Sequence, residues 1–160
     1  MTDPSANVGF VIIVILYAVI GLLAAAGSVV VSQKRFPGRS EQILYAVFLA
    51  PIAGFYLAFV AYFGNASAWR TELLAAVAFS LLGIFGTRYA AVLILGYLLH
   101  GIWDALHEFA LHAGWSVLAH GQLTEIPLAY GVFCAIYDIA IAAYCVRRKR
   151  SWERPPPSRG

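Results

Sequence analysis

Three ionisable residues, His100, Asp104 and His107, lie inside an apolar stretch over residues 93–108. Their spacing of four and then three residues places the side chains within roughly 60° on one face of a helix. Ionisable groups at membrane depth are costly unless they are paired, hydrated or bound to a cation. Two imidazoles and a carboxylate are also ligands that a borderline divalent metal selects. The pattern therefore predicts a divalent-metal site (zinc, iron or manganese) with these three residues as ligands.

Two carboxylates elsewhere in the chain extend this prediction. Asp138 lies in the last apolar segment at about the depth of His100, where it would complete the metal shell or act as a general base. Glu72 begins the third apolar segment, close in depth to His107, and is a second candidate for a catalytic carboxylate. Because a bound metal acidifies water toward neutral pH, the set points to a metal-dependent hydrolase. Its substrate would be a lipid or another hydrophobic small molecule.

The same residues fit two other functions. Asp104, His107 and Asp138 could relay protons or cations in a transporter or channel subunit. Alternatively, buried His–Asp pairs could lock two helices together in a structural membrane assembly protein. Five spans cannot form an even inverted repeat, which argues against transport. A homo-oligomer could still supply a pore, and the sequence leaves that alternative open.

Membrane-spanning helices must position these residues. Hydrophobic residues make up 61% of the 160-residue chain and charged residues 12%, against about 25% charged in soluble domains. Most of the apolar segments reach the roughly 20 residues that a bilayer requires. There are five, over residues 9–31, 42–63, 71–85, 89–111 and 126–146. We therefore predict an all-α polytopic membrane bundle of five transmembrane helices, a single domain over residues 1–150, with a disordered Pro-rich tail over residues 151–160.

The basic residues indicate how this bundle is oriented. Ten of the eleven lie after the first, third or fifth segment, and Arg70 is the exception. The positive-inside rule then places the N-terminus outside and the C-terminus in the cytoplasm. The sequence lacks the basic and aromatic surface pattern that holds nucleic acid, so membrane lipid is the expected partner and nucleic acid is not.

Two polar residues outside these sets are predicted to be structural. Glu41, close to Arg39, marks the start of the second helix. Tyr56 is predicted to be a packing aromatic of the core or of the membrane interface.

The last two helices carry a longer pattern, His100-x2-Trp103-Asp104-x2-His107, then Pro127, Cys134-x2-Tyr137-Asp138 and Tyr144. In this pattern the chain resembles a family of small, uncharacterised bacterial integral membrane proteins, over roughly residues 51–144. The resemblance implies a bacterial inner-membrane location and gives the same residues further weight. It implies no mechanism, because the family carries no established activity. Glu108 stands where the family pattern leads us to expect a second histidine, which weakens a two-histidine metal corner there.

Overall fold

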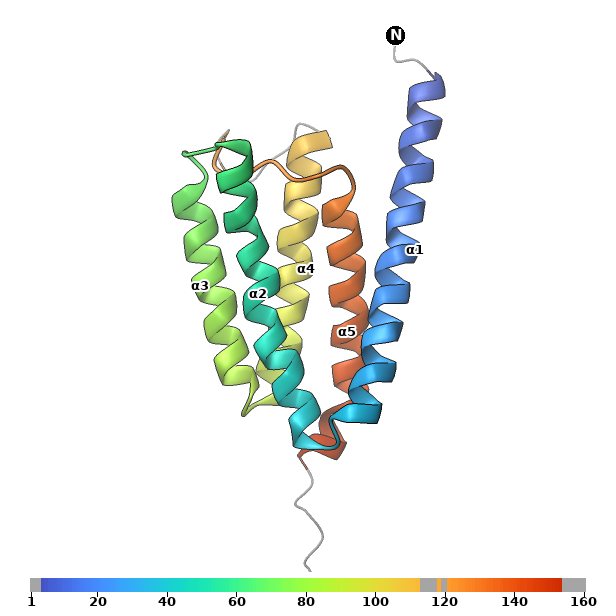
Figure 1. Cartoon of the computed structure of the whole chain (residues 1–160), viewed down its shortest axis with the longest axis vertical. Helices are drawn as coiled ribbons and strands as arrows, with labels where there is room; N and C mark the ends of the chain where they lie inside the picture. Colours follow the sequence, from blue (N-terminus) through green and yellow to red (C-terminus); the bar gives the residue numbers. More distant parts are fainter. Residues whose placement is uncertain (1–3, 113–117, 119–120, 154–160) are drawn as a thin grey trace, which may run out of the picture.

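The computed structural model describes residues 4–112, 118 and 121–153. Within these ranges the chain forms five α-helices and no strand. They are α1 (Pro4–Arg35), α2 (Arg39–Phe63), α3 (Trp69–Gly86), α4 (Ala90–His112) and α5 (Tyr130–Trp152) (Figure 1). All five are long and apolar enough to cross a membrane, which indicates a multi-pass membrane protein. The predicted all-α bundle of five such helices is confirmed.

The fifth helix is shifted relative to its predicted range. It begins at Tyr130, because Ala129 adopts a left-handed φ of 59° and the Tyr130 N–H donates to the Pro127 carbonyl oxygen across 3.0 Å. It ends at Trp152, beyond the basic residues 147–150, whose long unbranched side chains favour helix. The first two residues of the predicted tail are therefore helical. Glu153 follows the helix as its C-terminal cap residue, and residues 154–160 of that tail lie outside the described residues.

Successive helices run in opposite directions, so alternate links lie at the same end of the bundle (Figure 1). The α1–α2 link, the α3–α4 link and the C-terminal end of α5 share one end. Lys34, Arg39, Arg88 and Arg147 consequently gather at that end. We call it the basic end and the opposite one the loop end, after the long connection between α4 and α5.

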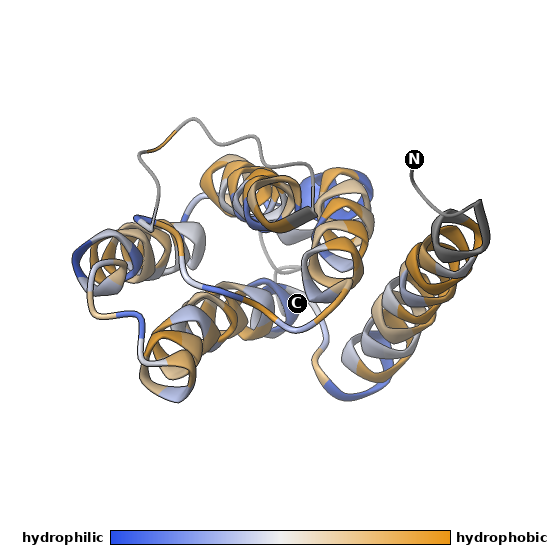
Figure 2. Ribbon diagram, turned by 90° about the horizontal axis from the view of Figure 1, so that it is seen from above, coloured by the Kyte–Doolittle hydropathy of each residue, from blue (hydrophilic) through white to orange (hydrophobic). Residues whose placement is uncertain are grey.

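Four helices surround the core, and α1 lies at the edge of the bundle (Figure 2). The α4 helix packs against α5 and α3, α2 packs against α3, and α1 packs mainly against α5. Two glycines permit close backbone contact in these pairs. A Cβ on Gly21 would lie 2.4 Å from the Phe133 carbonyl oxygen, and one on Gly131 would lie 2.5 Å from that of Asp104. Small residues at helix crossings bring neighbouring side chains within hydrogen-bonding reach.

Candidate metal centre

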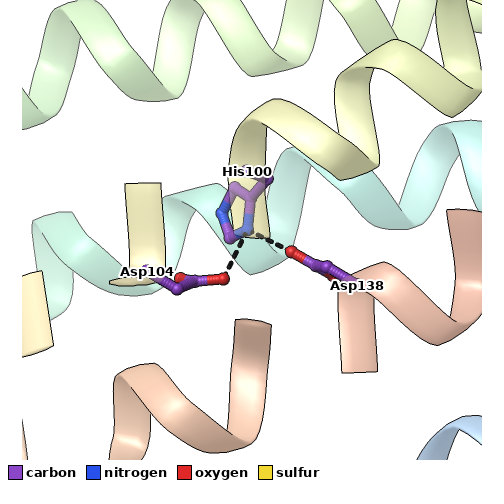
Figure 3. A group of neighbouring side chains, drawn as sticks. All are labelled: His100, Asp104 and Asp138. Carbon is purple, nitrogen blue, oxygen red and sulfur yellow. Dashed lines mark hydrogen bonds and ion pairs between the residues drawn. The ribbon is translucent and has the colours of Figure 1, made fainter. Parts of the chain in front are cut away.

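His100, Asp104 and Asp138 meet where α4 crosses α5 (Figure 3). The His100 Nδ1 atom lies 2.6 Å from Asp138 Oδ2 and 3.2 Å from Asp104 Oδ2. All three side chains are buried, with at most 1% of any residue exposed. One ligand atom from each lies within 4.8 Å of the others. We call these three residues the central triad.

The helix geometry explains how the central triad forms. His100 and Asp104 are four residues apart, so they lie one above the other on the same face of α4. Gly101 lies on the side of α4 that meets α5, where an added Cβ would be 3.3 Å from the Asp138 Cβ. The absence of a side chain at Gly101 therefore lets Asp138 approach His100.

The chemistry of the central triad fits a divalent metal. Asp104 Oδ2 lies 3.2 Å from His100 Nδ1 but has no hydrogen-bond partner among the described residues. Leaving such a buried atom unsatisfied costs about 1–3 kcal/mol. One imidazole and two carboxylates suit zinc, iron or manganese. His100 Nδ1 and one carboxylate oxygen each of Asp104 and Asp138 would hold such an ion.

Tyr56 on α2 connects the central triad to the next turn of α4. Its hydroxyl donates to Asp104 Oδ1, and its ring lies against the His107 imidazole with ring centroids 4.2 Å apart. Only 1% of Tyr56 is exposed. The sequence predicted a packing aromatic here, and the ring does pack. The hydroxyl role was missed, although a buried tyrosine hydroxyl usually has a hydrogen-bond partner.

His107 lies apart from the central triad and pairs with Glu72 of α3. Its Nε2 lies 2.8 Å from Glu72 Oε1, and its Nδ1 lies 2.9 Å from the Trp103 carbonyl oxygen. A carbonyl oxygen only accepts, so Nδ1 carries a hydrogen. A hydrogen bond between Nε2 and Glu72 Oε1 then needs a second proton, which lies either on Nε2 or on the carboxyl group and is shared by the two groups. The predicted ligand His107 and the predicted catalytic Glu72 thus form a separate unit, the Glu72–His107 pair.

The connection from α4 to α5 covers this pair at the loop end. The Thr124 backbone N–H donates to Glu72 Oε1 across 3.0 Å. Asn65 Nδ2 donates to the Leu123 carbonyl oxygen across 3.2 Å, which ties the connection to the α2–α3 link. Both Glu72 and Thr124 are at most 2% exposed. A carboxylate from α3 therefore closes the bundle by binding the backbone of the loop.

A protein-family model matches residues 13–151, which include the central triad and the Glu72–His107 pair. The chain belongs to the family of unknown function DUF6010. No curated protein and no solved structure matches it. The match supports an uncharacterised family, as the resemblance in the last two helices implied. It supplies no activity to transfer.

In this DUF6010 protein Glu108 has a structural role at the start of α5. Its Oε2 accepts the Gly131 backbone N–H across 3.1 Å. That N–H belongs to the first turn of α5, where backbone donors have no acceptor within the helix. The residue that replaces an expected histidine therefore caps the neighbouring helix. Glu108 also borders a groove of about 400 Å³ between α1 and the α4–α5 pair, otherwise lined by apolar residues such as Phe10, Phe109, Val132 and Ile136.

A second buried polar cluster lies at the basic end, where α1, α2 and α5 meet around Glu41. One carboxylate oxygen accepts from the Ser32 hydroxyl, across 3.1 Å, and from the Tyr144 hydroxyl. The other accepts from Arg148 Nε and Trp152 Nε1, both across 2.9 Å. We call these five residues the Glu41 cluster. Glu41 lies in the first turn of α2, as predicted. Its burial was not predicted. The sequence feature that could have indicated it is an acidic residue at the end of the bundle where the basic residues gather.

Proposed function

We propose that this protein is a metal-dependent membrane hydrolase whose metal is bound by the central triad. The proposal rests on one observation, that three buried ligand atoms, from His100, Asp104 and Asp138, lie within 4.8 Å of one another. The residues around them are largely apolar, and an unpaired buried carboxylate there would be expensive. In this proposal Asp138 takes the ligand position that was predicted for His107.

The described side chains divide the work of such a reaction. A bound divalent metal would act as a Lewis acid on a carbonyl or phosphoryl oxygen and would acidify water. Tyr56 orients Asp104 through its hydroxyl, as outer-shell partners of metal ligands commonly do. The Glu72–His107 pair shares a proton and is linked to the central triad by the Tyr56 side chain. The pair is therefore suited to accept a proton from the reaction or to return one.

The substrate we propose is a membrane lipid or another molecule with a hydrocarbon chain. The groove beside α1 is walled almost entirely by apolar side chains and lies on helices that could face lipid. Glu108, its carboxylate, is one turn along α4 from Asp104. A hydrocarbon chain in this groove would therefore bring a polar group at its end close to the central triad.

We also propose that the basic end faces the cytoplasm of a bacterium. The support is the gathering of basic residues at the α1–α2 and α3–α4 links and at the end of α5. The bacterial inner membrane is what the sequence resemblance implies. The N-terminus and the loop over the Glu72–His107 pair would then lie on the outer side.

The metal content of detergent-purified protein tests the hydrolase proposal, measured by inductively coupled plasma mass spectrometry. Wild type is expected to hold close to one zinc, iron or manganese ion per chain, and Asp104→Asn and Asp138→Asn should each lower its retention roughly 10-fold or more. His107→Gln is the matched control and should keep the metal. Folded wild type that binds no metal after supplementation, or metal retained in both Asn variants, would overturn the proposal.

A proton relay is the second candidate, and one observation favours it. Polar contacts run from Glu72 to His107, and Tyr56 bridges His107 to Asp104. Proton flux in proteoliposomes that disappears in Asp138→Asn would support a relay. Flux that is absent in wild type, or intact in that variant, would exclude it.

A further inference from the structure

Three buried polar atoms around the Glu72–His107 pair have no hydrogen-bond partner among the residues that the structure describes. They are Glu72 Oε2, Thr124 Oγ1 and Trp103 Nε1. Thr124 touches the pair through its backbone N–H, and the Trp103 ring lies 5.3 Å from the His107 ring, centroid to centroid. Glu72, His107 and Thr124 are at most 2% exposed. Native proteins rarely leave buried polar atoms without partners, so several around one pair indicate a ligand.

The chemistry of these atoms specifies the ligand. The carboxylate oxygen accepts, the indole N–H donates, and the threonine hydroxyl does both. An indole N–H does not ligate a metal, and the carboxylate disfavours an anion. Water supplies two donors and two acceptors and occupies buried sites that offer it two to four polar partners. A small neutral hydrogen-bonding molecule fits this set, and water is the simplest one.

We infer that the Glu72–His107 pair, with Thr124 and Trp103, is a buried water-binding site that supplies the water consumed at the central triad. The binding site stands on the orphaned atoms alone, whereas its role as a supply rests on the proposed hydrolase. In hydrolysis the water oxygen bonds to the acyl or phosphoryl atom. The bond to the leaving group breaks with its electron pair on the leaving atom, and one water proton ends there.

The position of the site suits this role. Tyr56 links the two units, with its ring on His107 and its hydroxyl on Asp104. Among the described residues of the α4–α5 connection, the segment around Thr124 covers the site at that end of the bundle. Water that enters from the loop end therefore reaches the Glu72–His107 pair before it reaches the central triad.

X-ray hydroxyl-radical footprinting of the full-length protein in detergent tests the inference, because radicals formed from bound water oxidise the adjacent side chains. The readout is the oxidation rate of His107, which is 0% exposed, against that of Tyr97, which is also 0% exposed and bonded to the Tyr45 carbonyl oxygen. His107 is expected to be oxidised several-fold faster. Oxidation of both residues at the same slow rate would overturn the water site.

Thr124→Val is the sharpest variant, because it removes the hydroxyl and keeps both the branched shape and the backbone N–H. It should lower His107 oxidation about fivefold, the effect of one lost hydrogen bond. Ser80→Ala is the matched control on α3, since the Ser80 hydroxyl already donates to the Ala76 carbonyl oxygen, and it should change nothing. Unchanged oxidation in Thr124→Val would overturn the site.

Metal analysis of the same samples separates the two proposals. Thr124→Val should keep the wild-type metal content, because Thr124 lies outside the central triad. Rapid His107 oxidation in folded protein that binds no metal would support the water site and overturn the hydrolase. Metal bound without His107 oxidation would do the reverse.

Discussion

Glu41 and the residues of the central triad are buried to the same degree, at most 1% exposed, yet the Glu41 cluster and the central triad differ in how completely their polar atoms are hydrogen-bonded. Donors from α1 and α5 serve both carboxylate oxygens of Glu41. In the central triad, Asp104 Oδ2 and His100 Nε2 have no hydrogen-bond partner in the described part of the chain. Burial of charge alone therefore does not identify a functional site in this bundle; incomplete satisfaction of that charge is the better indicator.

The two groups also differ in what they connect. The Glu41 cluster ties together three helices, including α1, which otherwise packs mainly on α5. The three residues of the central triad all come from α4 and α5, a pair that already packs closely at Gly101 and Gly131. Loss of the first group should therefore damage the fold, and loss of the second should damage ligand binding.

The largest effect is expected from Glu41→Ala. The substitution leaves Arg148, whose side chain is 32% exposed, without its carboxylate, and it deprives the buried Trp152 indole of its acceptor; the unsatisfied indole alone costs about 1–3 kcal/mol of unfolding free energy. SDS titration in mixed micelles measures it. Glu153→Ala, at an exposed acidic residue of the same end, is the control and should be close to neutral. If the Glu41→Ala protein were as stable as this control, the Glu41 cluster would not hold the helices together as we propose.

A smaller effect on folding and a clear effect on metal binding are expected from Tyr56→Phe. The ring stays against His107, but Asp104 loses the hydroxyl that orients it. Metal affinity should fall about 10–100-fold, while the unfolding free energy changes by about 1 kcal/mol. Competition with a chromophoric chelator measures the affinity. Tyr62→Phe, on the same helix and 82% exposed, should leave it unchanged, and an equal affinity in both variants would contradict the role of Tyr56.

The smallest effect on stability is expected from the triple variant His100→Leu, Asp104→Asn and Asp138→Leu, which leaves no carboxylate of the triad buried without a cation and keeps an acceptor for the Tyr56 hydroxyl. Neutral residues of similar volume often replace buried ionic groups without loss, so the unfolding free energy should stay within about 1 kcal/mol of wild type. Metal binding should be lost. A loss of stability comparable to that of Glu41→Ala would show that the central triad is a structural tie as well, and the two regions would then belong to one class.

The sequence predicted the helices well because hydrophobic length and basic links are local signals. The pairing of His100 with Asp104 was also local, since one turn of helix separates them. The residue that pairs with His107 could not be predicted from local sequence, because it lies on another helix. A helical-face argument treats His100 and His107 alike, but the second lies two turns nearer the loop end, where Glu72 of α3 reaches it first.

The Glu41 cluster was harder to predict for the same reason. Its donors come from positions 9 to 111 residues away in the chain, and no spacing rule connects a carboxylate at the start of α2 with a tryptophan at the end of α5. Three-dimensional packing had to bring them together. The sequence carried only a hint, an acidic residue among basic ones.

The Glu41 cluster also sets an order of events during synthesis. Tyr144 follows Glu41 by 103 residues, which a ribosome needs about 5–20 s to add. For that interval the carboxylate lacks its donors from α5, and α1 lacks the helix against which it mainly packs. Helix α1 is consequently fixed in place only after α5 has been made, and the last turns of α5 complete the Glu41 cluster.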